Sequence, residues 1–153
     1  MSQPPSFDVA AAHKYFSAHC FNQAWDLLEK ADRTRDDDQL MVALNQASIF
    51  HWRGRPDCSS KHLSVGYWQA SRIQAVLANA QEAQRYAEIC LAYSGELEPF
   101  YLGYAREALA RAAALGGDSL SLANHLAAAK AQAALVSRGE DRDALLQDLA
   151  ALG

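Results

Sequence analysis

Glycine, proline and cysteine are all scarce in this sequence. Among its 153 residues there are 8 glycines and 4 prolines, and two of the prolines lie within the first five positions. Alanine makes up roughly a fifth of the chain, a composition that favours closely packed helices over sheets. The three cysteines, Cys20, Cys58 and Cys90, are far apart and odd in number. This pattern argues against a disulfide framework and favours reduced thiols in a cytoplasm.

The sequence also lacks an excess of positive charge and a long apolar run. Its 14 basic and 18 acidic residues give a net charge of -4, without the basic stripe of a nucleic-acid-binding protein. No stretch approaches the roughly 18 apolar residues of a membrane span. The segment from Met1 to Asp8 lacks the basic and apolar regions of a signal peptide. We therefore expect a cytoplasmic protein without nucleic-acid or membrane partners.

No common catalytic or cofactor motif occurs in the sequence. The phosphate-binding, nucleotide-binding, nucleophile-elbow, zinc-protease and paired-cysteine patterns are all missing. We therefore assign no catalytic residue, no metal site and no cofactor, and an enzyme has no support from the sequence. His51, Cys58 and His62 have suitable ligand types, but their spacing matches no common zinc site. His13 and His19 fall on different faces of a helix and cannot pair as helical metal ligands.

Apolar residues recur every three or four positions, which predicts an all-α protein of about seven helices. Thr34 followed by Asp37 resembles a capping box and predicts a helix start, and Gly54 predicts the end of that helix. Gly139 is expected to end the sixth helix. We expect one domain over 1–153, built from three helix hairpins and a capping helix, at about 8–54, 60–94, 98–136 and 140–152.

The second half of the chain contains an internal repeat with a period of 39 residues. This offset superimposes Ala70 on Leu109 and the turn at Ala78 on the turn at Gly117, and it keeps small and apolar residues in phase. Both copies are expected to form a helix, a tight turn and a second helix. They resemble the units of tetratricopeptide repeat (TPR) arrays, which implies a short, right-handed TPR-like superhelix of stacked antiparallel hairpins.

Four segments carry a further resemblance, which spans nearly the whole chain. They resemble parts of a bacterial family of uncharacterised TPR-like proteins, and they are FNQAWDLL (21–28), ASIFHW (47–52), WQASR (68–72) and EDR (140–142). The resemblance implies a TPR-like fold in a bacterial protein. The family has no established activity, so the resemblance implies no catalytic or binding role.

Five residues are expected to face one groove. In a TPR array the first helix of each hairpin lines the concave face. When the repeat of this chain is aligned with such an array, the residues that line the groove are Trp68, Arg72, Tyr104, Glu107 and Arg111. An aromatic ring beside guanidinium groups is a combination enriched at binding hot spots. The alternative is structural: Glu107 and Arg111, four residues apart, form an ion pair with Arg72 near them, and Trp68 packs beneath. The sequence leaves both interpretations open.

Three hypotheses about function follow. The first is a non-catalytic module that binds a protein or peptide partner in the groove. The second is a structural homo-oligomer, such as a homodimer, in which an exposed apolar end of the stack pairs with its own copy. The leucine-rich last helix is one candidate for this surface, and the alternative is that it caps the core. The third is a small-molecule-binding protein or an enzyme with a pocket near His51, Trp52 and Trp68. For His51 the simpler expectation is a packed residue at a helix end, where the helix dipole favours an imidazolium.

Overall fold

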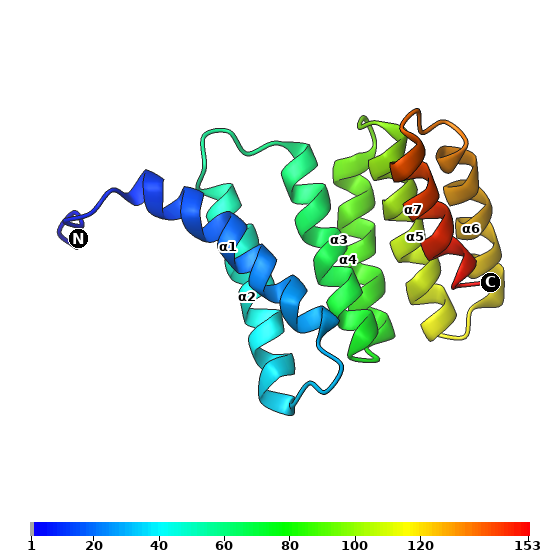
Figure 1. The fold of residues 1–153 in the computed structure, drawn as a ribbon, viewed down its shortest axis with the longest axis horizontal. Coiled ribbons are helices and arrows are strands. Elements are labelled where there is room, and N and C mark those ends of the chain that lie inside the picture. Colours follow the sequence, from blue (N-terminus) through cyan, green and yellow to red (C-terminus); the bar gives the residue numbers. More distant parts are fainter. Residues whose placement is uncertain (1) are drawn as a thin grey trace. The chain divides into compact units, whose positions relative to one another are not determined.

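The computed structural model describes residues 2–153, and every regular element in that range is a helix. Figure 1 labels the seven helices, which are α1 (Val9–Glu29), α2 (Arg35–Arg53), α3 (Ser60–Val76), α4 (Ala80–Ser94), α5 (Pro99–Leu115), α6 (Ser119–Ala133) and α7 (Gly139–Ala150). The all-α class and the number of helices are therefore confirmed for the described residues. None of these helices combines the length and the apolar character that a membrane span requires.

The start of α2 has the capping box that its sequence predicts. The Thr34 hydroxyl accepts a hydrogen bond from the backbone N–H of Asp37 at 3.1 Å, and the Asp37 carboxylate accepts one from the Thr34 N–H at 3.0 Å. The two bonds satisfy backbone donors that the first helical turn leaves without partners. The helix ends at Arg53, directly before Gly54, as expected.

The end of α6 differs from the sequence-based expectation. The helix stops at Ala133, and Gly139 begins α7 instead of ending α6. The backbone N–H groups of Leu135 and Val136 bond to carbonyls three residues back, at Gln132 and Ala133. This tighter pattern closes the last turn. Val136 therefore lies in the connecting segment, where its side chain is still buried.

The helices fall into two compact units, and the boundary lies between Ser59 and Ser60. The first unit contains the antiparallel pair α1 and α2, and the second contains α3 to α7. The boundary follows the loop after Gly54, where the sequence predicts a break between hairpins. The expected single domain over 1–153 stays a prediction.

In the first unit, small and apolar side chains pack α1 against α2. The buried apolar residues are Cys20, Ala24, Met41 and Ile49. The Ser48 hydroxyl donates a hydrogen bond to the backbone carbonyl of Ser17 at 2.7 Å, across the helix pair. Arg55, in the loop after α2, donates to the Ser17 hydroxyl at 2.9 Å. These bonds tie α2 and its following loop to α1.

In the second unit, the hairpins α3–α4 and α5–α6 pack side by side, and α7 lies against α5 and α6 (Figure 1). Gly103 permits the close approach of α5 to α7, because a Cβ atom at this position would lie 2.6 Å from Cδ2 of Leu145. Leu145 and Leu149 are buried in a cluster with Ala129 and Ala133. Two leucines of the last helix therefore belong to the core, while Leu146 stays exposed. The homo-oligomer hypothesis, which used this helix as a surface, stays a prediction.

The repeat is visible in the bounds of the helices. Each bound of α3 and α4 recurs 39 residues later in α5 and α6, and the four pairs are Ser60 and Pro99, Val76 and Leu115, Ala80 and Ser119, and Ser94 and Ala133. The first hairpin does not share these lengths, since α1 and α2 have 21 and 19 residues, whereas α3 and α4 have 17 and 15. The repeat is therefore a property of the second unit.

The turns within the two repeats also have the same geometry. Ala78 and Gly117 occupy equivalent positions and have positive φ angles of 61° and 74°. The next residue in each turn, Asn79 or Asp118, donates its backbone N–H to the carbonyl five residues back at 2.9 Å. The side chain of the same residue then caps the following helix. A left-handed residue after a helix is the usual way to make this turn, and glycine is the usual residue there.

The turn at Ala78 predicts opposite effects for two matched substitutions. The left-handed conformation of a residue with a Cβ atom is about 1–2 kcal/mol higher in free energy than its right-handed conformation. Glycine avoids this cost in the folded chain but loses more conformational entropy on folding, which offsets part of its advantage. We expect Ala78→Gly to raise the free energy of unfolding by about 1 kcal/mol and Gly117→Ala to lower it by about 1 kcal/mol. A Cβ atom at Gly117 would meet nothing within 4 Å, so the backbone alone is tested. Urea unfolding measures both changes, and changes of the same sign would contradict the prediction.

Candidate functional site

The five residues predicted for the groove come together in the second unit, on helices α3 and α5. The carboxylate of Glu107 lies at their centre. Its Oε2 atom accepts a hydrogen bond from the indole N–H of Trp68 at 3.2 Å, and its Oε1 atom accepts one from Nε of Arg111 at 2.9 Å. Nη1 of Arg72 lies 3.6 Å from the same Oε1 atom. The ion pair between Glu107 and Arg111, four residues apart on one helix, therefore forms, and Arg72 lies near it.

These contacts join equivalent positions of the repeat. Trp68 and Glu107 are 39 residues apart and bond to each other. Arg72 and Arg111 are separated by the same period, and both guanidinium groups approach Glu107. The period that sets the helix bounds therefore also sets which side chains meet between α3 and α5.

Glu107 is fully buried, whereas the two arginines reach solvent at their edges. Glu107 is 0% exposed, and the side chains of Arg72 and Arg111 are 26% and 21% exposed. A buried carboxylate is stable only when hydrogen bonds and opposite charge replace its water. The indole and the two guanidinium groups provide both for Glu107.

Trp68, Arg72, Tyr104, Glu107 and Arg111 are called the charged layer below. Within this layer, Arg72 has the fewest hydrogen-bond partners for its donors. Its Nη1 atom is buried and has no hydrogen-bond partner within residues 2–153, since the 3.6 Å separation from Glu107 exceeds hydrogen-bond length. Burial and the positive charge of Arg111 lower the pKa of Arg72, while Glu107 and Asp148 oppose this shift. A guanidinium with an unused buried donor is suited to an anionic acceptor.

Tyr104 connects the layer to the last helix. Its hydroxyl donates a hydrogen bond to Oδ2 of Asp148 on α7 at 2.9 Å, and its ring meets that of Trp68 edge to face, with centroids 5.6 Å apart. Burial, followed by the bond to Asp148, raises the pKa of Tyr104, so the hydroxyl remains a donor. The sequence offers no signal for Asp148, because nothing in its spacing relates the last helix to Tyr104.

A pocket of about 250 Å³ adjoins this layer. It is mostly apolar and is lined by Ser64, Val65, Trp68, Cys90, Phe100, Tyr101 and Tyr104. The aromatic walls stand at steep angles, with 89° between Phe100 and Tyr101 and 72° between Phe100 and Tyr104. The pocket exceeds the roughly 150 Å³ cavity that holds benzene in a protein core. One large apolar side chain therefore fits in it.

The polar atoms at the floor of the pocket bond to one another. The hydroxyl oxygens of Ser64 and Ser94 lie 2.7 Å apart, and Ser94 also donates to the backbone carbonyl of Cys90 at 2.7 Å. Burial raises the pKa of the Cys90 thiol to about 11, against the opposing effect of its bonds to Ser64 and Ser94. A thiol that stays protonated at neutral pH is a poor nucleophile. The floor is therefore suited to an apolar group rather than to covalent chemistry.

Part of the pocket lining could have been identified in the sequence. Phe100 and Tyr101 precede Tyr104 by four and three residues and therefore share its helix face. Val65 has the same relation to Trp68. Cys90 comes from α4, and only the packing of the hairpin brings it to the pocket.

His51 lies near the end of α2 in the first unit, whereas Trp68 belongs to the second. The Nδ1 atom of His51 is 2.9 Å from Nδ1 of His13 on α1, and the His51 ring packs beside the ring of Phe16. Burial and then His13 lower the pKa of His51. Burial and the second histidine therefore disfavour the imidazolium that the helix dipole alone would favour.

Trp52, the other residue assigned to a pocket near His51, lies in the last turn of α2 and stacks with Arg55 of the loop that follows. The guanidinium of Arg55 lies 3.9 Å from the centre of the Trp52 ring, and Arg55 also pairs with Asp57 at 2.6 Å. Within residues 2–153, no three His, Cys, Asp or Glu side chains are grouped as metal ligands.

Comparison with known proteins adds no assignment. No protein-family model matches the chain, and neither a curated protein nor a solved structure shows significant similarity to it.

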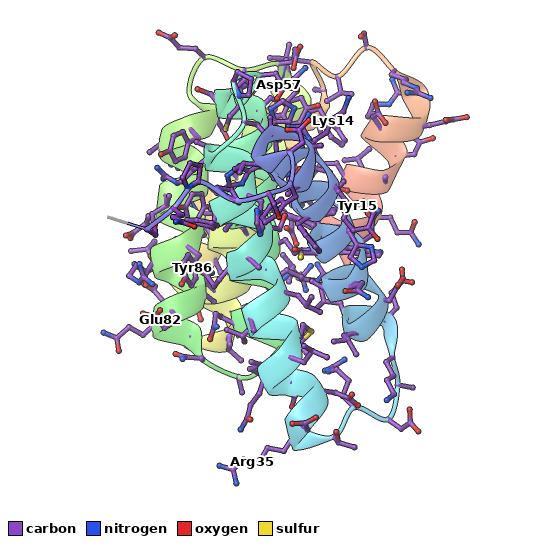
Figure 2. The ribbon with its side chains drawn as sticks, turned by 90° about the vertical axis from the view of Figure 1, so that its left-hand side faces the viewer. Lys14, Tyr15, Arg35, Asp57, Glu82 and Tyr86 are labelled. Carbon is purple, nitrogen blue, oxygen red and sulfur yellow. The ribbon has the colours of Figure 1, made fainter. Side chains whose placement is uncertain are left out.

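Removal of the central carboxylate should destabilise the second unit. Glu107→Gln keeps the size of the side chain but removes the one carboxylate that both Arg72 and Arg111 approach. We expect the free energy of unfolding to fall by about 2–3 kcal/mol, because solvent reaches both arginines and relieves part of the cost. Glu82→Gln is the matched control, since Glu82 pairs with Arg85 on the exposed side of α4 and points away from the helices (Figure 2). Urea unfolding should show no change for the control, and equal losses would refute the central role of Glu107.

Protonation of His51 should make stability depend on pH. Its pKa in the folded chain lies below the ordinary value of 6.5, so the unfolded chain takes up the proton first as pH falls. The stabilising contribution is complete above about pH 6.5 and is lost as pH falls from there toward the folded pKa. Between about pH 7.5 and about pH 5.5, the urea midpoint should therefore fall more in the wild type than in His51→Gln.

His125 is an internal control in this comparison. Burial and then Arg106 lower the pKa of His125, so it contributes a loss in the same direction to both proteins. Parallel pH profiles for the wild type and His51→Gln would show that His51 does not titrate as described.

Proposed function

We propose that the second unit is a TPR-like stack and that helices α3 and α5 form a groove for a protein or peptide partner. The chain would then be a non-catalytic interaction module of the bacterial TPR-like family that its segments resemble. Support for the stack comes from the equal bounds of the two hairpins and from their matching turns. Repeats of this kind bury their apolar faces against one another and use the surface formed by equivalent helices for binding.

One observation carries the binding proposal: an apolar pocket between α3 and α5 lies beside Trp68, one helical turn from the incompletely bonded guanidinium of Arg72 on α3. The pocket is formed largely by α3 and α5. Arg72 follows Trp68, which lines the pocket, by four residues on α3. Binding hot spots combine an aromatic pocket with arginine in this way.

The chemistry of the pocket supports binding rather than catalysis. Its thiol, Cys90, has a raised pKa of about 11, and the Tyr104 hydroxyl is held as a donor by Asp148. All three cysteines, Cys20, Cys58 and Cys90, are free, which supports the proposed cytoplasmic location. An apolar side chain of an extended peptide is the simplest occupant of a pocket with aromatic walls.

Filling the pocket from inside tests the proposal. Val65 lines the pocket from α3, and Val65→Phe places a ring in the space without removing any member of the charged layer. We expect the wild-type protein to enrich a set of sequences from a library of linear peptides, and we expect Val65→Phe to bind those peptides at least tenfold more weakly. Fluorescence anisotropy with labelled peptides gives the affinities, and circular dichroism shows whether the variant is folded.

Leu120→Ala is the control for non-specific apolar binding. Leu120 lies on α6 and is 74% exposed, so its removal should leave the affinities unchanged. Peptides that bind equally well to Val65→Phe, or an absence of any enrichment by the wild type, would overturn the proposed function.

A further inference from the structure

We infer that the pocket lined by Ser64, Trp68 and Tyr104 binds a neutral, flat, fused-ring aromatic molecule with one hydrogen-bond donor, such as indole. The donor bonds to the hydroxyl oxygen of Ser64 at the floor of the pocket. This inference goes beyond the proposed function, because it assigns a small-molecule ligand and does not depend on the binding of a peptide.

The hydrogen bonds at the floor of the pocket have a fixed direction. The Ser94 hydroxyl donates its only proton to the backbone carbonyl of Cys90 at 2.7 Å. Since the oxygens of Ser64 and Ser94 lie 2.7 Å apart, Ser64 must be the donor in the bond between them. In the described chain, the Ser64 oxygen then accepts at most the weak thiol donor of Cys90, 3.8 Å away. A hydroxyl oxygen has two acceptor sites, so Ser64 can accept a bond from a ligand but has no proton left to donate.

Two aromatic walls of the pocket have their polar hydrogens bonded to other partners. The indole N–H of Trp68 donates to Glu107 at 3.2 Å, and the hydroxyl of Tyr104 donates to Asp148 at 2.9 Å. A ligand with an acceptor would therefore find both of these donors in use, whereas a ligand with a donor would find Ser64. Because burial of a polar group without a hydrogen bond is unfavourable, the pocket favours a donor over an acceptor.

The size and shape of the pocket suit two fused rings. Its volume is about 250 Å³, whereas a cavity of roughly 150 Å³ holds one benzene ring. Ser64 and Cys90 are buried, while the aromatic walls are partly exposed, so a flat molecule can enter between the rings. The ring of Tyr104 stands at 79° to Trp68 and at 72° to Phe100. Such walls present both edges and faces, which are the contacts that aromatic pairs prefer.

The pocket also favours a molecule without charge. Its lining contains no acidic or basic residue, and burial raises the pKa of the Cys90 thiol to about 11, which keeps it neutral. Lys61, near the lining ring of Tyr101, pairs with Glu98 at 3.5 Å. A charged ligand would lose its hydration without gaining a free counter-charge, so a neutral donor is the better occupant.

Three molecules of nearly the same size test the inference. Indole has an N–H donor and no acceptor, indene has neither, and benzofuran has an oxygen acceptor in place of the donor. We expect indole to bind the wild-type protein with a Kd of about 1 mM or below, about fivefold more tightly than indene. Benzofuran should bind no more tightly than indene. Titrations followed by the amide NMR shifts of the protein give the affinities and show whether the lining residues respond.

Substitution of Ser64 should remove the preference for the donor. In Ser64→Ala, we expect indole to bind only as tightly as indene, because the acceptor is lost while the apolar walls remain. Ser71→Ala is the matched control, since Ser71 is a buried serine of the same helix whose hydroxyl donates to the carbonyl of Ala83 at 2.7 Å. Tyr101→Phe removes another hydroxyl of the lining and keeps its ring. Both controls should retain the full preference.

Ser94→Ala is the second variant, for use if Ser64→Ala fails to fold. Without Ser94, the proton of Ser64 is released, so its hydroxyl can donate as well as accept. We expect the difference between indole and benzofuran to become smaller in this variant. An unchanged difference would show that the two serines do not set the preference and would refute the inference.

The remaining outcomes separate this inference from the proposed function. Equal affinities of indole and indene for the wild type, a preference for indole that persists in Ser64→Ala, or no saturable binding of indole would each show the inference to be wrong. None of these results affects the proposed function, which Val65→Phe tests with peptides. If indole shows the expected preference but the wild type enriches no peptides, the proposed function is wrong and the inference stands.

Discussion

The carboxylate of Glu107 occupies a position from which water is excluded, and much of the second unit is arranged to keep it there. An ionised group costs several kcal/mol to bury unless charge and hydrogen bonds replace its hydration. Trp68 reaches it from α3 and Arg111 from its own helix, at distances of 3.2 and 2.9 Å. The bond from Trp68 joins α3 to α5, whereas the bond from Arg111 lies within α5. The pocket and the orientation of Arg72 depend on how α3 lies beside α5, since both are built from the same two helices.

The sequence predicted the helices well because their ends are coded locally. The capping box of Thr34 and Asp37 and the break after Gly54 involve residues within a few positions of one another. The prediction that Gly139 ends α6 was wrong, because a single glycine does not specify a helix end. It is compatible with the residue after one helix and with the first residue of the next. There the backbone bonds of Leu135 and Val136 close α6 well before Gly139. Local chemistry therefore predicted the helix starts better than this particular end.

The candidate site was predictable to the extent that the 39-residue repeat carries it. The phase of the repeat predicted which residues of two neighbouring helices meet, and they are Trp68, Arg72, Tyr104, Glu107 and Arg111. The ion pair between Glu107 and Arg111 follows from their spacing of four residues alone. The use of Asp148 by Tyr104 depends on how α7 packs, and no repeat or motif specifies that packing. Nor does the spacing show that Arg111 would bond to the carboxylate while Nη1 of Arg72 has no hydrogen-bond partner in the described chain. The two equivalent arginines lie 2.9 and 3.6 Å from the same Oε1 atom, a difference that residue spacing does not specify.

The bond between Trp68 and Glu107 also gives the stack a direction. The two residues stand at equivalent positions of successive repeats, yet one can only donate and the other accepts. Two copies of the α3–α4 hairpin placed in succession would bring indole against indole, and two copies of the α5–α6 hairpin would bring carboxylate against carboxylate. Only the order found in the chain joins donor to acceptor. Two hairpins with nearly the same backbone are therefore not interchangeable at this contact, because it joins unlike side chains.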